Sequence, residues 1–152
     1  MNIVLVAPLI PQNTGAIGRL CVCTDARLHL IEPLGFIIDD KHIKKAGMDY
    51  WKHLDVTIHP DWQSFLDSEQ PQSMSFLSTR GKKSLYDIEF TKHDYLVFGN
   101  ESDGLPRDFY KIYEDDLFLI PMPGQNSRSH NLANSVSIAL YEAMRQTDFS
   151  IS

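Results

Sequence analysis

Short runs of β-branched and other apolar residues constrain most strongly what this chain can fold into. The first run, residues 2–7, is apolar without alternation after Asn2 and is ended by Pro8. That pattern is typical of a strand buried on both faces, as found in parallel sheets that helices cover. Further strands are expected at residues 28–32, 55–59, 73–78, 95–98 and 117–120.

Segments with helical spacing separate these strands. Apolar side chains recur at helical intervals in residues 15–26, and shorter helices are expected at residues 41–46 and, after a capping Asp61, at residues 62–67. Alternating strands and helices predict an α/β fold, a mostly parallel sheet flanked by helices, in one domain over residues 1–152. The clearest helix follows the last strand, with apolar positions at Leu132, Val136, Ala139, Leu140 and Ala143.

Composition narrows the class of protein. The chain has 152 residues, of which 43% are hydrophobic and 22% charged, and these ordinary values exclude disorder and collagen-like repeats. The net charge of −6 counts against general phosphate-driven binding of nucleic acid but leaves a local basic patch open. Cys21 and Cys23 are too close to cross-link a domain. No secretory signal or long apolar span is visible, so we expect a cytoplasmic protein without a membrane partner.

Several binding and catalytic motifs are absent. No GxGxxG follows the first strand, and no GxxxxGK[ST], HExxH or GxSxG occurs, which argues against dinucleotide binding, P-loop NTPases, zinc proteases and α/β-hydrolases. The cysteine pair has no second pair, so no metal site is expected. Ligands of parallel sheets bind beyond the carboxyl ends of the strands. The search for function therefore narrows to three loops, residues 8–14, 99–106 and 121–131.

The first loop allows two interpretations. Gly15 is expected to open the first helix, whose free N–H groups could bind an anion, and Arg19 could point back toward the loop. The alternative is a plain helix start with a surface arginine. Gly18 lies inside the expected helix, where glycine is unfavourable, and this suggests that another backbone approaches closely.

The second loop also allows two interpretations. Gly99 and Gly104 let the backbone turn tightly and approach a ligand. Glu101 could hold backbone N–H groups or a ribose hydroxyl. An ordinary polar turn before a helix is equally consistent with these residue types.

The third loop is long and polar and leads directly into the C-terminal helix. Tyr141, within that helix, could point away from the core or be buried at a helix contact. The loop carries more capping groups than one helix needs, which favours a binding site for a small ligand held largely by backbone groups. Four of these groups surround Arg128: Ser127, Ser129, Asn131 and Asn134.

Three motifs follow one another along the chain. They are Asn13-x-Gly15-x-x-x-Arg19, Phe98-Gly99-x-Glu101-x-x-Gly104-Leu105-Pro106, and Ile120-Pro121-Met122 followed by Ser127-Arg128-Ser129-x-Asn131-Leu132-x-Asn134-Ser135-Val136. Together they resemble the motifs of the SPOUT superfamily of RNA methyltransferases. The resemblance covers residues 2–146 and is closest to the short, single-domain branch that 2′-O-methylates the wobble nucleotide of tRNA. His130 and Ala16 depart from the usual pattern and bear on the choice of RNA.

The resemblance implies a fold, a cofactor and partners. It implies a C-terminal trefoil knot, a homodimer, and S-adenosyl-L-methionine as methyl donor with no metal. The implied substrate is the tRNA anticodon stem-loop, methylated on the ribose of a wobble cytidine or modified uridine. The residues implied to bind the donor are Leu77, Gly99, Glu101, Gly104, Ile120, Met122, Ser129 and Leu132.

The resemblance also implies catalytic residues. Arg19 is expected to act on the 2′-hydroxyl, although a guanidinium stays protonated, so anchoring the 3′-phosphate is physically easier than acting as a base. Ser129, Asn131 and Tyr141 would orient the ribose or stabilise the acceptor of its proton.

Two alternatives stay open: 2′-O-methylation of another tRNA or rRNA ribose, and a non-catalytic regulator that binds an adenosine ligand.

Lysines in two stretches could face RNA or form a solvated surface: Lys41, Lys44, Lys45, Lys52, Lys82 and Lys83.

Overall fold

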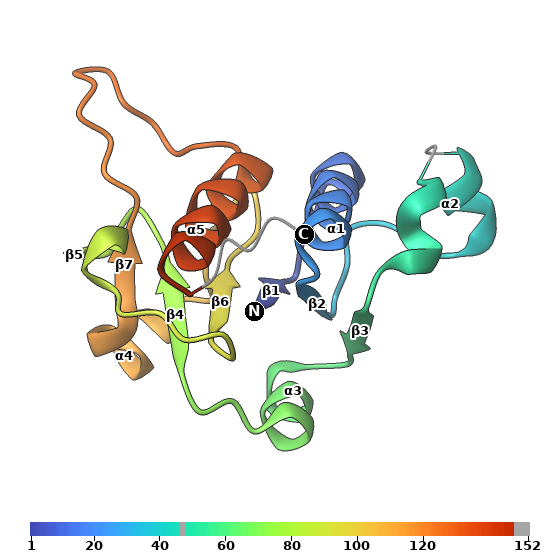
Figure 1. The fold of residues 1–152 in the computed structure, drawn as a ribbon, viewed down its shortest axis with the longest axis horizontal. Helices are drawn as coiled ribbons and strands as arrows, with labels where there is room; N and C mark the ends of the chain where they lie inside the picture. The colour runs from blue at the N-terminus through green and yellow to red at the C-terminus, as the bar shows by residue number, and fades with distance from the viewer. Residues whose placement is uncertain (46–47, 148–152) are drawn as a thin grey trace.

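Seven strands form one sheet in the centre of the molecule (Figure 1). The structure is a computed structural model that describes residues 1–45 and 48–147. The strands run in the order β3-β2-β1-β6-β4-β7-β5 and all neighbours are parallel, which confirms the expected α/β class. Their bounds are β1 (Asn2–Val6), β2 (Arg27–Ile31), β3 (Val56–His59), β4 (Met74–Leu77), β5 (Lys83–Ser84), β6 (Tyr95–Phe98) and β7 (Leu117–Leu119).

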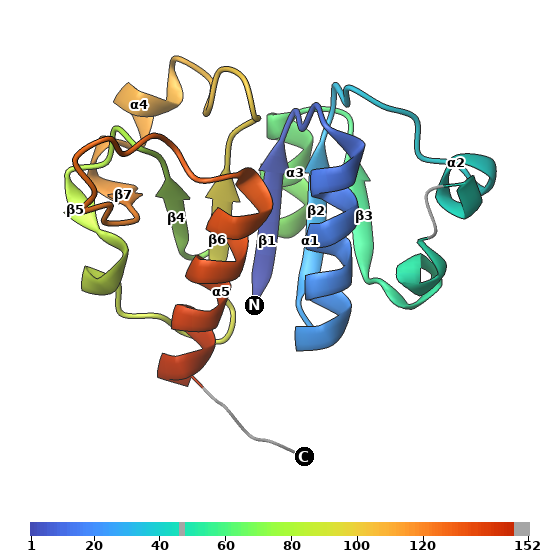
Figure 2. The same ribbon diagram turned by 90° about the horizontal axis from the view of Figure 1, so that it is seen from above.

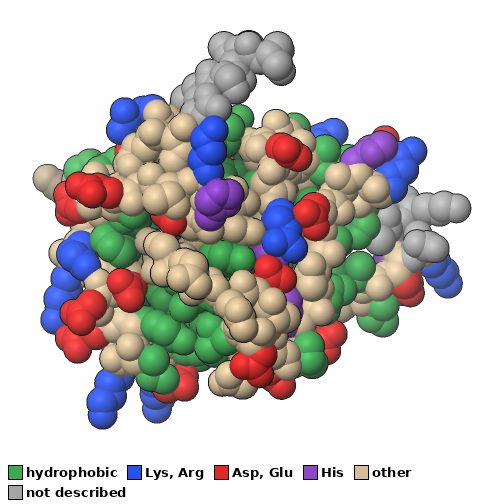
Figure 3. Space-filling model, turned by 60° about the horizontal axis from the view of Figure 1, so that its bottom comes forward, with side chains coloured by type: hydrophobic (Ala, Val, Ile, Leu, Met, Phe, Trp, Pro, Cys, Tyr) green, Lys and Arg blue, Asp and Glu red, His purple; other side chains and the backbone are tan. Residues whose placement is uncertain are grey.

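Helices cover both faces of the sheet (Figure 2). The helices α1 (Pro11–Thr24) and α5 (Leu132–Thr147) lie side by side on one face, and α3 (Trp62–Glu69) lies on the other. On the face that carries α3, basic and acidic side chains are interspersed without a broad area of one sign (Figure 3). Shorter helices are α2 (Asp40–Lys45), α4 (Phe109–Ile112), and the 3₁₀ helices η1 (Asp49–His53), η2 (Leu85–Asp87) and η3 (Glu114–Asp116).

The apolar character of β1 follows from its place between β2 and β6. Ile3 and Leu5 belong to the core that includes residues of α1 and α5, whereas Val4 and Val6 belong to the core beneath α3. All five residues of β1 are buried. Burial of one aliphatic side chain contributes about 1.5–3 kcal/mol to the free energy of unfolding. Because β1 buries such side chains on both faces, packing stabilises it from both sides, as its sequence predicts.

The largest difference from expectation concerns α1, which begins at Pro11 rather than at Gly15. Proline is favourable in the first helical turn because its missing N–H would have no partner there in any case. Much of the loop expected at residues 8–14 is therefore helix, and Gly15 lies on the buried side of α1. The helix ends at Thr24, after which Asp25 takes the left-handed conformation with a φ of 54°.

Short elements escaped the sequence patterns. The strand β5 has two residues, and α4 has four, which is too few for a period to show. The helix expected at residues 41–46 is found as α2, while residue 46 lies outside the described residues. As expected, Asp61 caps α3: its carboxylate accepts a hydrogen bond of 2.7 Å from the N–H of Ser64.

The expectation that another backbone approaches Gly18 is wrong. A Cβ atom at this position would lie 3.1 Å from the ring of Trp51 and 3.2 Å from the side chain of Leu54. The glycine instead makes room for side chains that pack η1 and the following residue against α1. The hydroxyl of Tyr50 strengthens this contact by donating a hydrogen bond to the carbonyl of Gly15.

The two cysteines lie in different environments. Cys21 is buried and Cys23 is exposed, and both are free thiols. Burial raises the pKa of Cys21 to about 12, so this thiol stays protonated at neutral pH and behaves as a small core residue.

Across residues 1–45 and 48–147, no helix has the length and apolar character needed to cross a membrane.

Truncation of Leu140 is expected to destabilise the protein strongly. This residue is fully buried on α5, so Leu140→Ala leaves a cavity and should lower the free energy of unfolding by about 2–5 kcal/mol. Ile112→Ala is the matched control, because Ile112 is 62% exposed and its truncation should change that free energy by less than about 0.5 kcal/mol. Urea unfolding at one protein concentration measures both values. Equal effects would contradict the described packing of α5.

Candidate functional site

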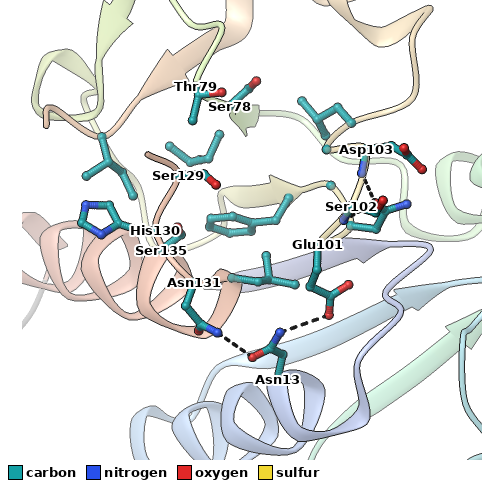
Figure 4. A pocket seen from close by; sticks show the side chains of 18 of the residues that line it. Asn13, Ser78, Thr79, Glu101, Ser102, Asp103, Ser129, His130, Asn131 and Ser135 are labelled. Carbon is teal, nitrogen blue, oxygen red and sulfur yellow. Dashed lines mark hydrogen bonds between the residues drawn. The ribbon is translucent and has the colours of Figure 1, made fainter. Parts of the chain in front are cut away.

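The carboxyl ends of β4, β6 and β7 lie at the same end of the sheet and open onto a cavity of about 430 Å³ (Figure 4). The segments that follow these strands line it, together with the first turn of α1 and the start of α5. This is where ligands bind in parallel sheets. The two later loops singled out in the sequence therefore meet the start of the first helix at one place.

All eight residues expected to bind the cofactor line this cavity. They come from positions as far apart in sequence as 77 and 132, and the sheet order brings them together. Their binding role stays a prediction, while their common location is a feature of the structure. These residues are Leu77, Gly99, Glu101, Gly104, Ile120, Met122, Ser129 and Leu132.

Two glycines shape the loop that follows β6. The backbones of Asn100 and Gly104 exchange hydrogen bonds of 3.0 and 3.2 Å, which closes a tight turn. Gly104 has a φ of +73°, a conformation that favours glycine. A Cβ atom on Gly99 would lie only 1.9 Å from the carbonyl carbon of Gly104. The turn can therefore form only with glycine at position 99.

The Glu101 side chain holds the start of α1. Its carboxylate accepts hydrogen bonds from the N–H groups of Leu9 at 2.8 Å and Ile10 at 3.0 Å, and from Nδ2 of Asn13 at 3.3 Å. A negative charge is favourable at a helix N-terminus. Of the two roles considered for Glu101, the structure shows the binding of backbone N–H groups. The prediction that an outside anion finds free N–H groups at Gly15 is wrong, since that residue lies inside α1.

A second hydrogen bond joins the third segment to this arrangement. Nδ2 of Asn131 donates to Oδ1 of Asn13 at 2.9 Å, as drawn in Figure 4. Oδ1 of Asn131 accepts from the N–H of Asn134 at 3.2 Å and so caps α5. Glu101, Asn13 and Asn131 thus form a chain of hydrogen bonds that connects the loop after β6, the start of α1 and the start of α5.

The expected catalytic residues fall into two groups. Ser129 and Asn131 line the cavity, whereas Arg19 and Tyr141 do not. Arg19 is exposed on α1, and its guanidinium lies over the ring of Tyr50, 5.6 Å from the centroid. Tyr141 is 46% exposed on α5, so of the two orientations considered the structure shows the one away from the core. One chain alone does not assemble the four residues.

The sequence analysis missed part of the lining. Ser78 and Thr79 follow β4 and face the cavity, and the hydroxyl of Ser78 donates to that of Tyr110 at 3.2 Å. Their signal was available, because the strand at residues 73–78 ends at the same edge of the sheet as the other parallel strands. The loop after it is short, with the single glycine Gly81, and did not stand out by composition.

The charge of the lining favours some ligands over others. Glu101 and Asp103 are carboxylates of this cavity, and none of the described residues that line it is lysine or arginine. Anion sites in proteins rely on those cations or on free N–H groups at a helix start. Because Glu101 already takes the N–H groups next to α1, the cavity suits a neutral or cationic ligand better than a phosphate.

The sequence and the fold together identify the class of protein. The model of the SpoU rRNA Methylase family matches residues 1–141, and this chain belongs to that family. The cavity, the turn at Gly99 and the hydrogen bonds that join Glu101, Asn13 and Asn131 thus occur in a chain of the SpoU methylase family.

Particular relatives are similar over the whole chain. The tRNA (cytidine(34)-2′-O)-methyltransferase of Saccharophagus degradans is 47% identical and covers 98% of this chain and 97% of its own. A solved structure has the description "Structural insights into the 2-OH methylation of C/U34 on tRNA". It is 43% identical to this chain with a TM-score of 0.84, and the match covers 95% of this chain and 94% of that chain. The SpoU methyltransferase AviRb from Streptomyces viridochromogenes, solved with the cofactor AdoMet, is 26% identical with a TM-score of 0.81 and covers 96% and 60%.

Substitution of Gly99 is expected to disrupt the site. In Gly99→Ala the new methyl group would overlap the backbone of Gly104, so the turn must rearrange at a cost of at least about 2 kcal/mol. Gly124→Ala is the matched control in the third segment, where a Cβ atom meets no other atom within 4 Å. It should be neutral or stabilise by less than about 1 kcal/mol. Thermal unfolding of both variants checks the prediction, and a fully stable Gly99→Ala variant would contradict the described turn.

Removal of the Glu101 charge is expected to loosen the start of α1. Glu101→Gln replaces an acceptor oxygen with an NH₂ group that faces N–H donors, and should cost about 1–2 kcal/mol because the site is partly solvated. Asp103→Asn is the control in the same turn, since its side chain accepts none of the hydrogen bonds described for that turn. Hydrogen exchange of the Leu9 and Ile10 amides, faster in Glu101→Gln alone, measures the effect. Equal exchange in both variants would disprove the assigned role.

Proposed function

We propose that this chain transfers a methyl group from S-adenosyl-L-methionine to the ribose 2′-oxygen of the wobble nucleotide in the tRNA anticodon loop. The observation that carries the proposal is the 47% identity to a tRNA (cytidine(34)-2′-O)-methyltransferase over nearly both full chains. The cavity built from the three motifs supports it. The proposed base at the target position is cytidine or a modified uridine, in line with the C/U34 named for the relative of known structure.

The cavity suits this methyl donor in size and charge. A volume of about 430 Å³ lies in the usual range for small-molecule sites, and a lining with carboxylates and without lysine or arginine accommodates a sulfonium cation. Leu77, Ile120 and Leu132 offer apolar walls for an adenine ring. When bound, the donor supplies a methyl group already activated by the positive charge on sulfur, so the proposal assigns no metal to the transfer.

The residues of this chain would position the ribose and its neighbouring phosphate. Ser129 and Asn131 lie in the cavity, where a hydroxyl and an amide can orient the 2′-hydroxyl for in-line attack. Arg19 stays protonated and would anchor the 3′-phosphate with two hydrogen bonds. As the methyl group reaches the 2′-oxygen, the hydroxyl proton leaves to a nearby acceptor or to water.

The position of Arg19 favours action as a homodimer. This residue and Tyr141 are exposed and lie outside the cavity of their own chain. In the proposed dimer, both side chains contact RNA that is held between the two subunits. We further propose a C-terminal trefoil knot, as implied by the SPOUT resemblance, together with the single domain over residues 1–152 and the cytoplasmic location expected from the sequence.

One of the two lysine stretches is the better candidate for an RNA-facing patch. Lys41, Lys45 and Lys52 are exposed around α2 and η1, the region packed against the helix that carries Arg19. Lys82 and Lys83 face an acidic segment instead. Lys82 lies 4.0 Å from Glu114, and Lys83 donates to the carbonyl of Asp115.

Two alternatives make different predictions. Methylation of another tRNA or rRNA ribose keeps the same chemistry at a different nucleotide, and the description of the matched family names rRNA. A regulator that binds an adenosine ligand needs the cavity but has no use for Arg19. Labelled methyl transfer to separate tRNA and rRNA fractions distinguishes the three.

The proposed activity is tested by transfer of labelled methyl groups from S-adenosyl-L-methionine to bulk tRNA from a strain that lacks such an enzyme. Alkali-resistant label at position 34 is the expected result. Arg19→Ala should reduce transfer by roughly 100-fold or more, because positioning of the ribose is lost, while the affinity for the methyl donor stays unchanged.

Arg145→Ala is the matched control for this experiment. Arg145 lies near the C-terminal end of α5 and pairs with Glu142, outside the described lining of the cavity. Its substitution should leave transfer intact. No label in either RNA fraction with the unmodified protein would overturn the proposed function, and loss of donor binding in Arg19→Ala would overturn the role given to that residue.

A further inference from the structure

A buried cluster of two histidines and one glutamate lies under α3, apart from the cavity. His29 is in the middle of β2, His59 ends β3 and Glu69 ends α3. The two rings are almost fully buried, and the Glu69 side chain is 13% exposed. None of the three residues lines the cavity proposed for the methyl donor.

Three possible ligand atoms converge in this cluster. Nδ1 of His29 lies 3.1 Å from Nε2 of His59 and 3.9 Å from Oε1 of Glu69. All three atoms are within 4.8 Å of one another. Ligands of a tetrahedral zinc ion are about 3.0–3.5 Å apart, because the bonds to zinc are about 2.0–2.2 Å long. The two imidazole nitrogens already have this spacing, and the Glu69 carboxylate, 3.9 Å from Nδ1 of His29, would move closer on binding.

A second layer of hydrogen bonds prepares His29 as a ligand. Oδ1 of Asn2 lies 3.4 Å from Nε2 of His29. The Asn2 amide is oriented by its Nδ2, which donates to the carbonyls of His93 and Asp94. These bonds place the ring proton on Nε2 and leave the Nδ1 lone pair facing His59 and Glu69. An oxygen that holds the outer N–H of a histidine is the usual partner of a metal-binding imidazole.

Hydrogen bonds also orient the carboxylate of Glu69, so that one of its oxygens faces His29. Its Oε2 accepts hydrogen bonds of 3.3 Å from Arg27 and from the hydroxyl of Tyr95, which leaves Oε1 on the side of His29. Nδ1 of His29 and Oε1 of Glu69, 3.9 Å apart, are therefore both available to a shared ion.

We propose that His29, His59 and Glu69 form a site for one divalent zinc ion, with water as the fourth ligand. Two imidazoles and one carboxylate suit zinc, whereas magnesium and calcium prefer oxygen ligands. The ion would join β2, β3 and α3 at the β3 edge of the sheet. The sequence analysis expected no metal because it searched for close spacings, and these ligands are 30 and 10 residues apart.

The proposal is tested on the untagged full-length protein after removal of metal with a chelator. Titration with ZnCl₂ against a chromophoric chelator should show one bound equivalent, and CoCl₂ should give the visible absorption of a tetrahedral site. Loss of a residue that only hydrogen-bonds a metal ligand weakens metal binding by roughly 10- to 100-fold. His59→Gln and Glu69→Gln each remove a ligand, so each should weaken zinc binding by more than that. Far-UV circular dichroism establishes that each variant is folded.

His93→Gln is the matched control, because His93 is exposed and its side chain is outside the cluster. It should bind zinc as the unmodified protein does, and zinc should raise the melting temperature of both. Absence of a bound equivalent in the unmodified protein, or unchanged affinity in folded Glu69→Gln, would overturn the proposal. Methyl transfer is not needed for either result, so the zinc site and the proposed function are tested separately.

Discussion

The carboxylate of Glu101 is the group on which the arrangement of the site depends. It accepts hydrogen bonds from two backbone N–H groups and from Asn13, and Asn13 in turn accepts one from Asn131. Segments that are about 90 and 120 residues apart in sequence thereby take fixed places around one cavity. A binding site made largely of backbone groups needs such external support, because loops hold their shape only when their polar groups are satisfied.

Much of the fold was predictable from the sequence, and the reason is burial. In β1, Ile3 and Leu5 pack on one face and Val4 on the other, so the strand is apolar without alternation. The start of α1 was not predictable, because the Glu101 side chain that holds it comes from a distant loop. Two-residue β5 and the packing of Trp51 against Gly18 were missed for a similar reason: neither leaves a periodic signal in its own segment.

The candidate site was predictable only in part. Positions such as Gly99 and Gly104 stand out because the backbone needs glycine there, and the motif resemblance gave further lining residues but not Ser78 and Thr79. The place of Arg19 was not predictable, since it depends on the packing of Tyr50 against α1. Among the described residues, no lysine or arginine lines the cavity, whereas Arg19 is exposed outside it. This arrangement is consistent with the proposal that the methyl donor and the RNA phosphate bind to different surfaces.

We propose that the three segments joined by Glu101, Asn13 and Asn131 form the binding site of the methyl donor. The most direct measurement is a crystal structure of the protein with S-adenosylhomocysteine, the product that remains after methyl transfer. We expect the adenosine to lie in the cavity, with its hydrogen bonds to backbone groups of the segments after β4, β6 and β7. Ligand bound elsewhere, or bound in this cavity only after the Glu101 and Asn131 contacts have broken, would contradict it.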